Sequence, residues 1–180
     1  DKNLFQKLEY AYINNVRNSI LFTNGQLLIQ DDTYKKLADS GVAIIGVDID
    51  GFSQETYEQI RIGGDFKALK DGIENLYNYV RKCRLNTRVE LAYHIYNGVN
   101  EKEIDIFVEW CEENGFEYKL VTMHNWAGLR KDVPSNKVDG LIDQHHMKRF
   151  SPCSALWAGF SIAWDGRVGL CFQDADLCEE

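Results

Sequence analysis

The chain has 180 residues, of which 44% are hydrophobic and 27% charged, the composition of a globular domain. Its 20 basic and 28 acidic residues give a net charge of −8, which excludes a nonspecific nucleic-acid binder. No apolar run approaches the roughly 20 residues that cross a bilayer, and no secretory signal pattern opens the sequence. We therefore expect a cytoplasmic protein whose five cysteines are reduced thiols or ligands of a metal or cluster.

Helical and strand-like patterns alternate over the first 122 residues. Apolar side chains recur every three or four positions in some segments, and short apolar or alternating runs lie between these segments. The patterns predict helices over 4–12, from Asp31 or Asp32 to near Gly41, over 66–83 and from Ile104 to Gly115, and strands over 20–22, 42–45, 87–95 and 116–122.

Three local signals sharpen these boundaries. Asp65 is the predicted N-cap of the 66–83 helix. Asn100 and Glu103 are spaced as a capping box before the last helix. Two alternating runs around Asp165-Gly166 predict a hairpin with a type I′ turn. Strands that alternate with helices indicate an α/β fold with a parallel sheet, to which a short antiparallel hairpin is appended.

Polar residues follow each predicted strand, at the end where ligands of parallel sheets bind. Each of them alone has a structural explanation, such as a turn, a cap or a satisfied core histidine. Their shared edge indicates a polar small-molecule pocket. The residues are Asn24, the alternating pair Asp48 and Asp50, His94 with Tyr96, and His124 with Asn125.

The cysteines fall into two groups. Cys83 and Cys111 lie in helical patterns and are predicted to be core or semi-buried thiols. Cys153 precedes the hairpin and Cys171 lies on its second predicted strand, so that the hairpin would bring the two thiols together as ligands of a soft metal or an iron–sulfur cluster. Cys178 is either a third ligand or incidental.

Several stretches, taken in order, resemble a radical SAM enzyme that carries a SPASM extension. Thr23-Asn24-Gly25-Gln26-Leu27-Leu28 is similar to a segment after the third barrel strand of that family. Residues 48–66 are similar to its S-x-D-G-x-S…Y-x-x-I-R-x-G-G-x-F stretch. Cys153, twelve residues, Gly166, four residues and Cys171 fit the first SPASM half-motif, C-x(9–15)-G-x(4)-C.

The resemblance implies a partial parallel (β/α) barrel followed by a hairpin that starts a SPASM-like extension. Residues 1–130 would form the later part of the barrel, 131–150 a connector, and 151–180 the beginning of the iron–sulfur domain. The family's C-x(3)-C-x-x-C loop and Gly-Gly-Glu segment are absent from the sequence, and Asp48 stands where the family often has serine. We therefore interpret the chain as a piece of a longer enzyme that lacks the first two strands.

The resemblance also implies cofactors, namely S-adenosylmethionine and a [4Fe–4S] cluster in the parent enzyme and an auxiliary [4Fe–4S] cluster at the extension. We expect none of them to be fully bound by this chain. Arg61 would pair with the cofactor carboxylate, and no catalytic residue is assigned. The residues expected near the cofactor are Asn24, Asp48, Asp50, Arg61, His94 and Asn125, and the expected metal ligands are Cys153 and Cys171.

The implied activity is an oxidoreductase-type radical reaction that abstracts hydrogen from a peptide, protein or sugar substrate. The chain alone is predicted to be inactive, and to self-associate through the unpaired edge of the 20–23 strand. Two alternatives stay open at this point. One is a non-catalytic binding or scaffold module with the same fold, and the other is an unrelated α/β domain with a structural metal.

Overall fold

The computed structural model describes residues 2–122, 159–163 and 165–169. The chain divides into two compact units, Asp1–Val121 and Thr122–Glu180. The first unit contains the sheet and its helices. The described part of the second unit is a hairpin.

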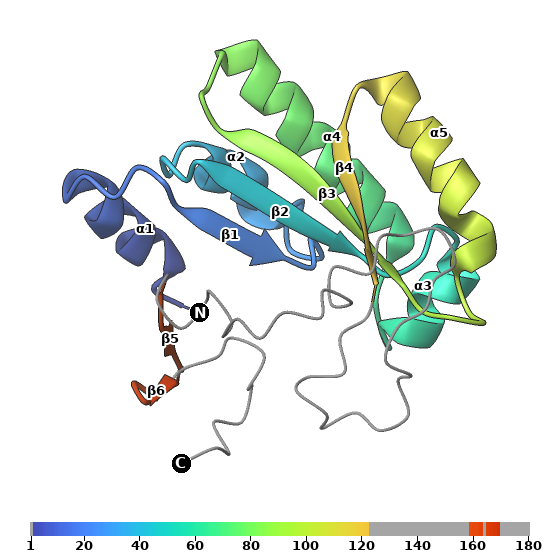
Figure 1. Cartoon of the computed structure of the whole chain (residues 1–180). Coiled ribbons are helices and arrows are strands. Elements are labelled where there is room, and N and C mark those ends of the chain that lie inside the picture. The colour runs from blue at the N-terminus through green and yellow to red at the C-terminus, as the bar shows by residue number, and fades with distance from the viewer. Residues whose placement is uncertain (1, 123–158, 164, 170–180) are drawn as a thin grey trace, which may run out of the picture. The chain divides into compact units, whose positions relative to one another are not determined.

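A four-stranded parallel sheet forms the centre of the first unit (Figure 1). Its strands, in spatial order, are β1 (Ile20–Thr23), β2 (Ile44–Ile49), β3 (Arg88–Ile95) and β4 (Glu117–Thr122). The spatial order equals the chain order, because a helical segment follows each of the first three strands and returns the chain to the start of the next one. This confirms the predicted α/β class and matches part of a (β/α) barrel.

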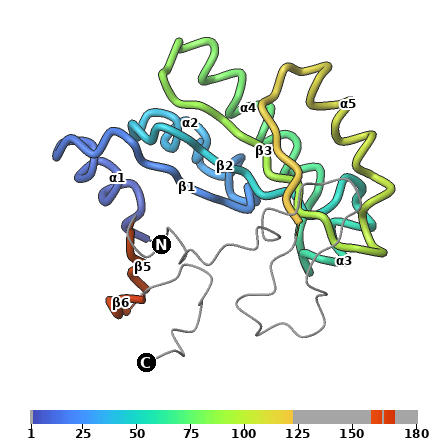
Figure 2. Tube along the Cα trace, viewed as in Figure 1, coloured from blue at the N-terminus to red at the C-terminus, as the bar shows by residue number. Residues whose placement is uncertain are grey.

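In the described part of the chain, five α-helices and two short 3-10 helices accompany the sheet. Figures 1 and 2 show α2, α4 and α5 on one side of it. We call the other side of the sheet, turned away from these helices, the opposite face. The helices are α1 (Leu4–Ile13), η1 (Gln30–Asp32), α2 (Thr33–Ala38), α3 (Gln54–Ile60), α4 (Phe66–Cys83), η2 (Glu101–Glu103) and α5 (Ile104–Asn114).

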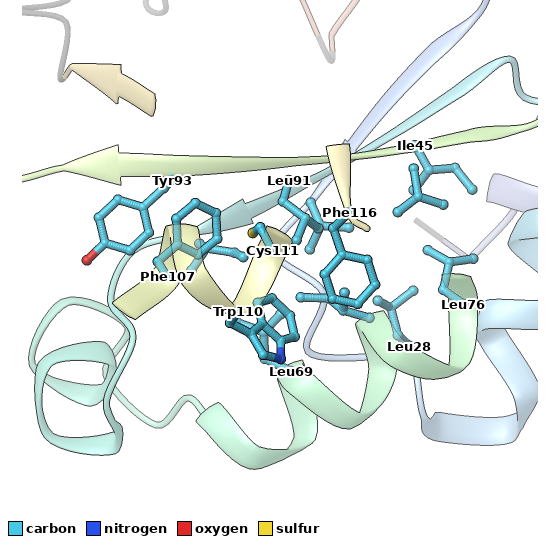
Figure 3. Packing of buried hydrophobic residues seen from close by; sticks show 14 of the residues in the cluster. Leu28, Ile45, Leu69, Leu76, Leu91, Tyr93, Phe107, Trp110, Cys111 and Phe116 are labelled. Carbon is cyan, nitrogen blue, oxygen red and sulfur yellow. The ribbon is translucent and has the colours of Figure 1, made fainter. Parts of the chain in front are cut away.

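The core lies between the sheet and the helices on its covered side, α2, α4 and α5 (Figure 3). Alternate residues of β2 and β3 point into the core. Full burial of one large aliphatic or aromatic side chain stabilises the fold by roughly 1.5–3 kcal/mol. Phe107 of α5 stacks on Tyr93 of β3 with ring centroids 4.8 Å apart. The core residues labelled in Figure 3 are Leu28, Ile45, Leu69, Leu76, Leu91, Tyr93, Phe107, Trp110, Cys111 and Phe116.

Most of the predicted elements are present, and one helix is additional. The N-cap prediction for Asp65 is confirmed, because its Oδ1 accepts the Ala68 N–H at 2.9 Å. Helix α3 was not among the predicted elements. Its signal in the sequence is Ser53, whose hydroxyl oxygen accepts the Thr56 N–H at 3.2 Å as an N-cap.

Two predicted caps differ in the structure. Asp32 occupies the N-cap position of α2, but its side chain makes no capping hydrogen bond and instead lies 3.0 Å from Lys35 Nζ. The capping box of Asn100 and Glu103 is wrong. Glu103 instead accepts the Phe52 N–H at 2.6 Å and the Ser53 hydroxyl at 2.5 Å, because these donors converge on it from the start of α3.

The predicted hairpin is present as β5 (Ser161–Ile162) and β6 (Val168–Gly169), which pair antiparallel. Its turn is not the predicted type I′. Gly166 has a φ of +90°, but Asp165 is not among the residues with positive φ. Ala163 N–H donates to the Arg167 carbonyl at 2.8 Å, so the loop is longer than two residues.

None of the helices in the described segments has the length and the apolar character that a membrane crossing requires.

Candidate functional site

The carboxyl ends of β2 and β3 carry the central pair of predicted site residues on the opposite face. Ile45, Val47 and Ile49 of β2 are buried in the core, so the alternating Asp48 points to the other side. Asp48 lies across from Ala92 in the register, and His94 follows two residues later on the same face. Asp48 and His94 are therefore diagonal neighbours on adjacent strands, close enough for their side chains to meet.

His94 Nε2 lies 3.0 Å from Asp48 Oδ1, and each side chain is about one quarter exposed. This contact holds the imidazole ring in one orientation and becomes an ion pair when the ring is protonated. A carboxylate accepts hydrogen bonds from hydroxyl groups, and an imidazole both donates and accepts. The pair is therefore suited to binding a polar ligand at this end of the sheet.

The remainder of the opposite face carries paired charges nearer the amino ends of the strands. Lys119 Nζ lies 2.6 Å from Glu90 Oε1 and 5.3 Å from the centre of the Phe22 ring. Arg88 Nη2 lies 2.5 Å from Glu117 Oε2. These exposed pairs contribute little to stability. They make the opposite face polar between the amino ends of the strands and the Asp48–His94 pair.

Asp50 has a different role, because it is buried with only 1% of its surface exposed. Its Oδ1 accepts the Tyr96 hydroxyl at 2.8 Å, and its Oδ2 accepts Arg61 Nε in a salt bridge. Both carboxylate oxygens are thus engaged within the protein. In this structure Asp50 braces the loop after β2 against Arg61 and the end of β3.

The pKa values of its partners follow from this arrangement. Burial, and then the charge of Asp50, raise the pKa of the Tyr96 hydroxyl well above its usual value of 10.0. Burial acts to lower the pKa of Arg61, but the hydrogen bond and charge of Asp50 outweigh it and raise that pKa. Tyr96 therefore stays protonated and Arg61 stays charged throughout the physiological range.

Asn100 fixes the two strand ends to each other, a role that the sequence patterns did not indicate. It is fully buried. Its Nδ2 donates to the carbonyls of Asp50 and His94, each at 2.8 Å, and its Oδ1 accepts the Tyr96 N–H at 2.8 Å. One amide side chain thus satisfies backbone groups on both sides of the Asp48–His94 pair.

Asn24 and Arg61, two other predicted site residues, line a separate groove of about 750 Å³. It lies between the loop after β1 and the segment that joins α3 to α4, and Ala68 of α4 contributes to its wall. Because α4 packs on the core side of the sheet, the groove is not on the opposite face. We call it the outer groove. The predicted site residues therefore divide between two places rather than one.

The remaining predicted residues are Asn125, Cys153 and Cys171, which lie outside the described residues, as do His124 and Cys178. Within the described part, both cysteines are free thiols, and Cys111 is buried as predicted. The prediction for Cys83 is wrong, because it is exposed at the C-terminal end of α4. Burial raises the pKa of Cys111 to about 12, as expected of an inert core thiol. No group of three or more metal-ligating side chains occurs among the residues that the structure describes.

Comparison with known proteins assigns this chain to a family. The family model described as "Radical SAM superfamily" matches residues 2–111, more than half of the chain. The chain belongs to the radical SAM superfamily. This overturns the alternative of an unrelated α/β domain.

Two relatives are both named "GTP 3',8-cyclase". The protein of Aliarcobacter butzleri (strain RM4018) is 27% identical over 149 residues, which cover 81% of this chain and 43% of the relative. The protein of Alkaliphilus metalliredigens (strain QYMF) is 26% identical over 137 residues, which cover 71% of this chain and 40% of the relative. The chain thus spans less than half the length of these relatives.

Proposed function

We propose that this chain is the later part of the barrel of a longer radical SAM enzyme, and that it binds the adenosyl cofactor at the carboxyl ends of β2 and β3. The observation that carries the proposal is the Asp48–His94 contact at 3.0 Å on the opposite face of the sheet, within the segment that matches the family. Ligands of parallel sheets bind at this end of the strands.

The donor set there fits S-adenosylmethionine. Asp48 can accept hydrogen bonds from sugar hydroxyls, and His94, held by Asp48, can donate to or accept from the same ligand. When bound together with an iron–sulfur cluster, this cofactor supplies one-electron reductive cleavage, which yields a radical able to remove hydrogen from a substrate. The chain's own contribution is to bind and orient the cofactor.

Asn100 and Asp50 keep that binding geometry fixed. Asn100 holds the carbonyl of His94 and the loop carbonyl of Asp50 at 2.8 Å each, so the strand ends that carry the pair stay at a constant separation. The Asp50–Arg61 salt bridge holds the loop that follows Asp48. Both act as positioning residues. Asn100 holds the backbone of His94, and Asp50 holds the loop after β2 through Arg61 and Tyr96.

The cluster that would start the reaction does not fit this chain. The sequence contains no C-x(3)-C-x-x-C pattern, and of the described thiols Cys111 is buried and Cys83 lies in another helix. We derive no step through a cluster here, and we propose that the 180 residues alone are inactive.

The finer features of the activity are also proposals. Cys153 and Cys171 would ligate an auxiliary [4Fe–4S] cluster in a SPASM-like extension, on the basis of their spacing around Gly166. The substrate would be a peptide, a protein or a sugar. A second candidate is cyclisation of GTP, which the names of the two relatives favour. A non-catalytic scaffold with the same fold is the remaining alternative.

The test is anaerobic reconstitution of the full-length protein, followed by measurement of iron, sulfide and 5′-deoxyadenosine. We expect about four or more iron and sulfide per chain, and cofactor cleavage under reducing conditions. Asp48→Asn should lower cofactor affinity, whereas Asp71→Asn, an exposed helix residue, should not. Incubation with GTP, with peptides or proteins, and with sugars then separates the substrate candidates. If the protein contains zinc or no metal and does not cleave the cofactor, the non-catalytic scaffold is the alternative that is left.

A further inference from the structure

The outer groove is a second candidate binding site that the proposed function does not use. Its volume of about 750 Å³ is within the range of small-molecule sites, roughly 300–1,000 Å³. It lies on the helix side of the sheet, whereas Asp48 and His94 lie on the opposite face. A ligand in this groove therefore contacts neither member of that pair.

The two walls of the groove are fixed to each other by one side chain. Gln26, from the loop after β1, accepts the Asp65 N–H at 2.8 Å through Oε1. Its Nε2 donates to the Asp65 carbonyl at 3.1 Å and to the Tyr57 hydroxyl at 3.0 Å. Because these bonds join loops 39 residues apart in the chain, the groove exists before a ligand binds.

Both walls present exposed aliphatic side chains. Leu27 and Ile29 are 60% and 42% exposed, and Ile62 on the facing segment is 95% exposed. Large apolar side chains that gather at a groove mark a binding site more often than single exposed ones do. Burying this surface would favour a ligand with an aliphatic body.

Arg61 gives the groove its cationic group. Its Nε is held by the buried Asp50, and the described residues make no other hydrogen bond or salt bridge to its guanidinium. The terminal nitrogens of a guanidinium form a planar fork that matches a carboxylate. Asp65 also lines the groove, but its Oδ1 accepts the Ala68 N–H at the N-terminus of α4, where the helix dipole offsets its charge.

We propose that the outer groove binds an aliphatic carboxylate. The carboxylate pairs with the Arg61 guanidinium, and the aliphatic body packs on Leu27, Ile29 and Ile62. Two sources share this chemistry, a free branched-chain acid and the C-terminal residue of a peptide. The site does not depend on the proposed function, because it shares no ligand-facing residue with the Asp48–His94 pair.

The test is a titration of the ¹⁵N-labelled 180-residue chain with N-acetyl-L-leucine, followed by amide NMR, with N-acetyl-L-leucinamide as the uncharged matched probe. We expect the signals of Gln30, Gly63 and Gly64 to shift, and binding of the amide to be about ten-fold weaker. A peptide that ends in leucine binds more tightly than the free acid if the natural ligand is a peptide, and equally if it is a free acid. Either result supports the binding of an aliphatic carboxylate in the outer groove.

Two variants separate the groove from nonspecific adsorption. Ile62→Glu should weaken binding about ten-fold or more, because it removes apolar surface and repels the carboxylate. Ile106→Glu is the control, since Ile106 is also exposed, at 58%, but lies on α5. Equal binding of acid and amide, or equal weakening by both variants, would overturn the proposal. It would also be overturned if S-adenosylhomocysteine shifted the groove signals, because the groove would then belong to the cofactor.

Discussion

At the scale of single residues, the two aspartates at the carboxyl end of β2 have different roles although they are only two positions apart. Asp48 is about one quarter exposed and contacts His94, whereas Asp50 is buried and satisfied by Arg61 and Tyr96. The sequence predicted both at one site from their alternation. Only the structure separates them, because the chain leaves the sheet between them and turns Asp50 inward.

This difference predicts an asymmetric response to substitution. Asp50→Asn removes the charge that pairs with the half-buried Arg61, and we expect it to lower the free energy of unfolding by about 2–4 kcal/mol. Asp71→Asn, which breaks the exposed pair with Lys67, should lower it by less than about 0.5 kcal/mol. Urea denaturation of both variants measures this. Similar losses in the two variants would show that Asp50 is not a structural brace.

At the scale of elements, the loop after β1 depends on a glycine. Gly25 has a φ of +73°, and a Cβ there would overlap Leu69 Cδ1 and lie 3.1 Å from Val47 Cγ1. Gly25→Ala should therefore lower stability by about 2–4 kcal/mol, from backbone strain and overpacking together. Gly98→Ala is the matched control, since Gly98 has a φ of +78° with nothing within 4 Å of the added atom.

Gly98→Ala should lower stability by only about 1 kcal/mol, the contribution of the positive φ alone. The comparison uses the midpoint of thermal or urea unfolding of the two variants. If Gly25→Ala were no worse than Gly98→Ala, the loop after β1 would not be packed as tightly against α4 as the structure shows.

The elements also show which features a sequence can predict. Helix α4 follows from its apolar spacing and Asp65, because both are local signals, and the structure confirms them. The capping box of Asn100 and Glu103 fails because its members find better partners 50 or 51 residues away, on the loop after β2. Contacts of that range depend on how strands align, which local patterns do not encode.

The candidate site shows the same limit. Alternation placed Asp48 and His94 at the ends of neighbouring strands, and the register brings them into contact. The outer groove was not predicted as a separate place, because its walls come from two loops far apart in the chain, which Gln26 connects. The role of Asn100 was also missed, since an asparagine before a helix is usually a cap.

At the scale of the whole molecule, the edge of the sheet predicts the behaviour of the 180-residue chain in solution. Among the described strands β1 pairs only with β2, and Ile20 and Phe22 of β1 are 56% and 55% exposed. We expect self-association through this edge. Sedimentation at tens of micromolar should show species larger than one chain, and Phe22→Lys should shift them toward the monomer. A monomeric wild-type profile would contradict the expectation.

The most direct test of the account is whether the adenosyl cofactor binds at the Asp48–His94 pair. The measurement is an NMR titration of the 180-residue chain with S-adenosylmethionine, in which the ring signals of His94 are assigned among the four histidines by His94→Gln. We predict shifts at His94 and at the Asp48 amide, no shifts at Gly63 and Gly64, and about ten-fold weaker binding in Asp48→Asn. The claim would be contradicted if saturating cofactor left the His94 ring signals unshifted, or if the cofactor bound the Asp48→Asn variant as tightly as the wild type.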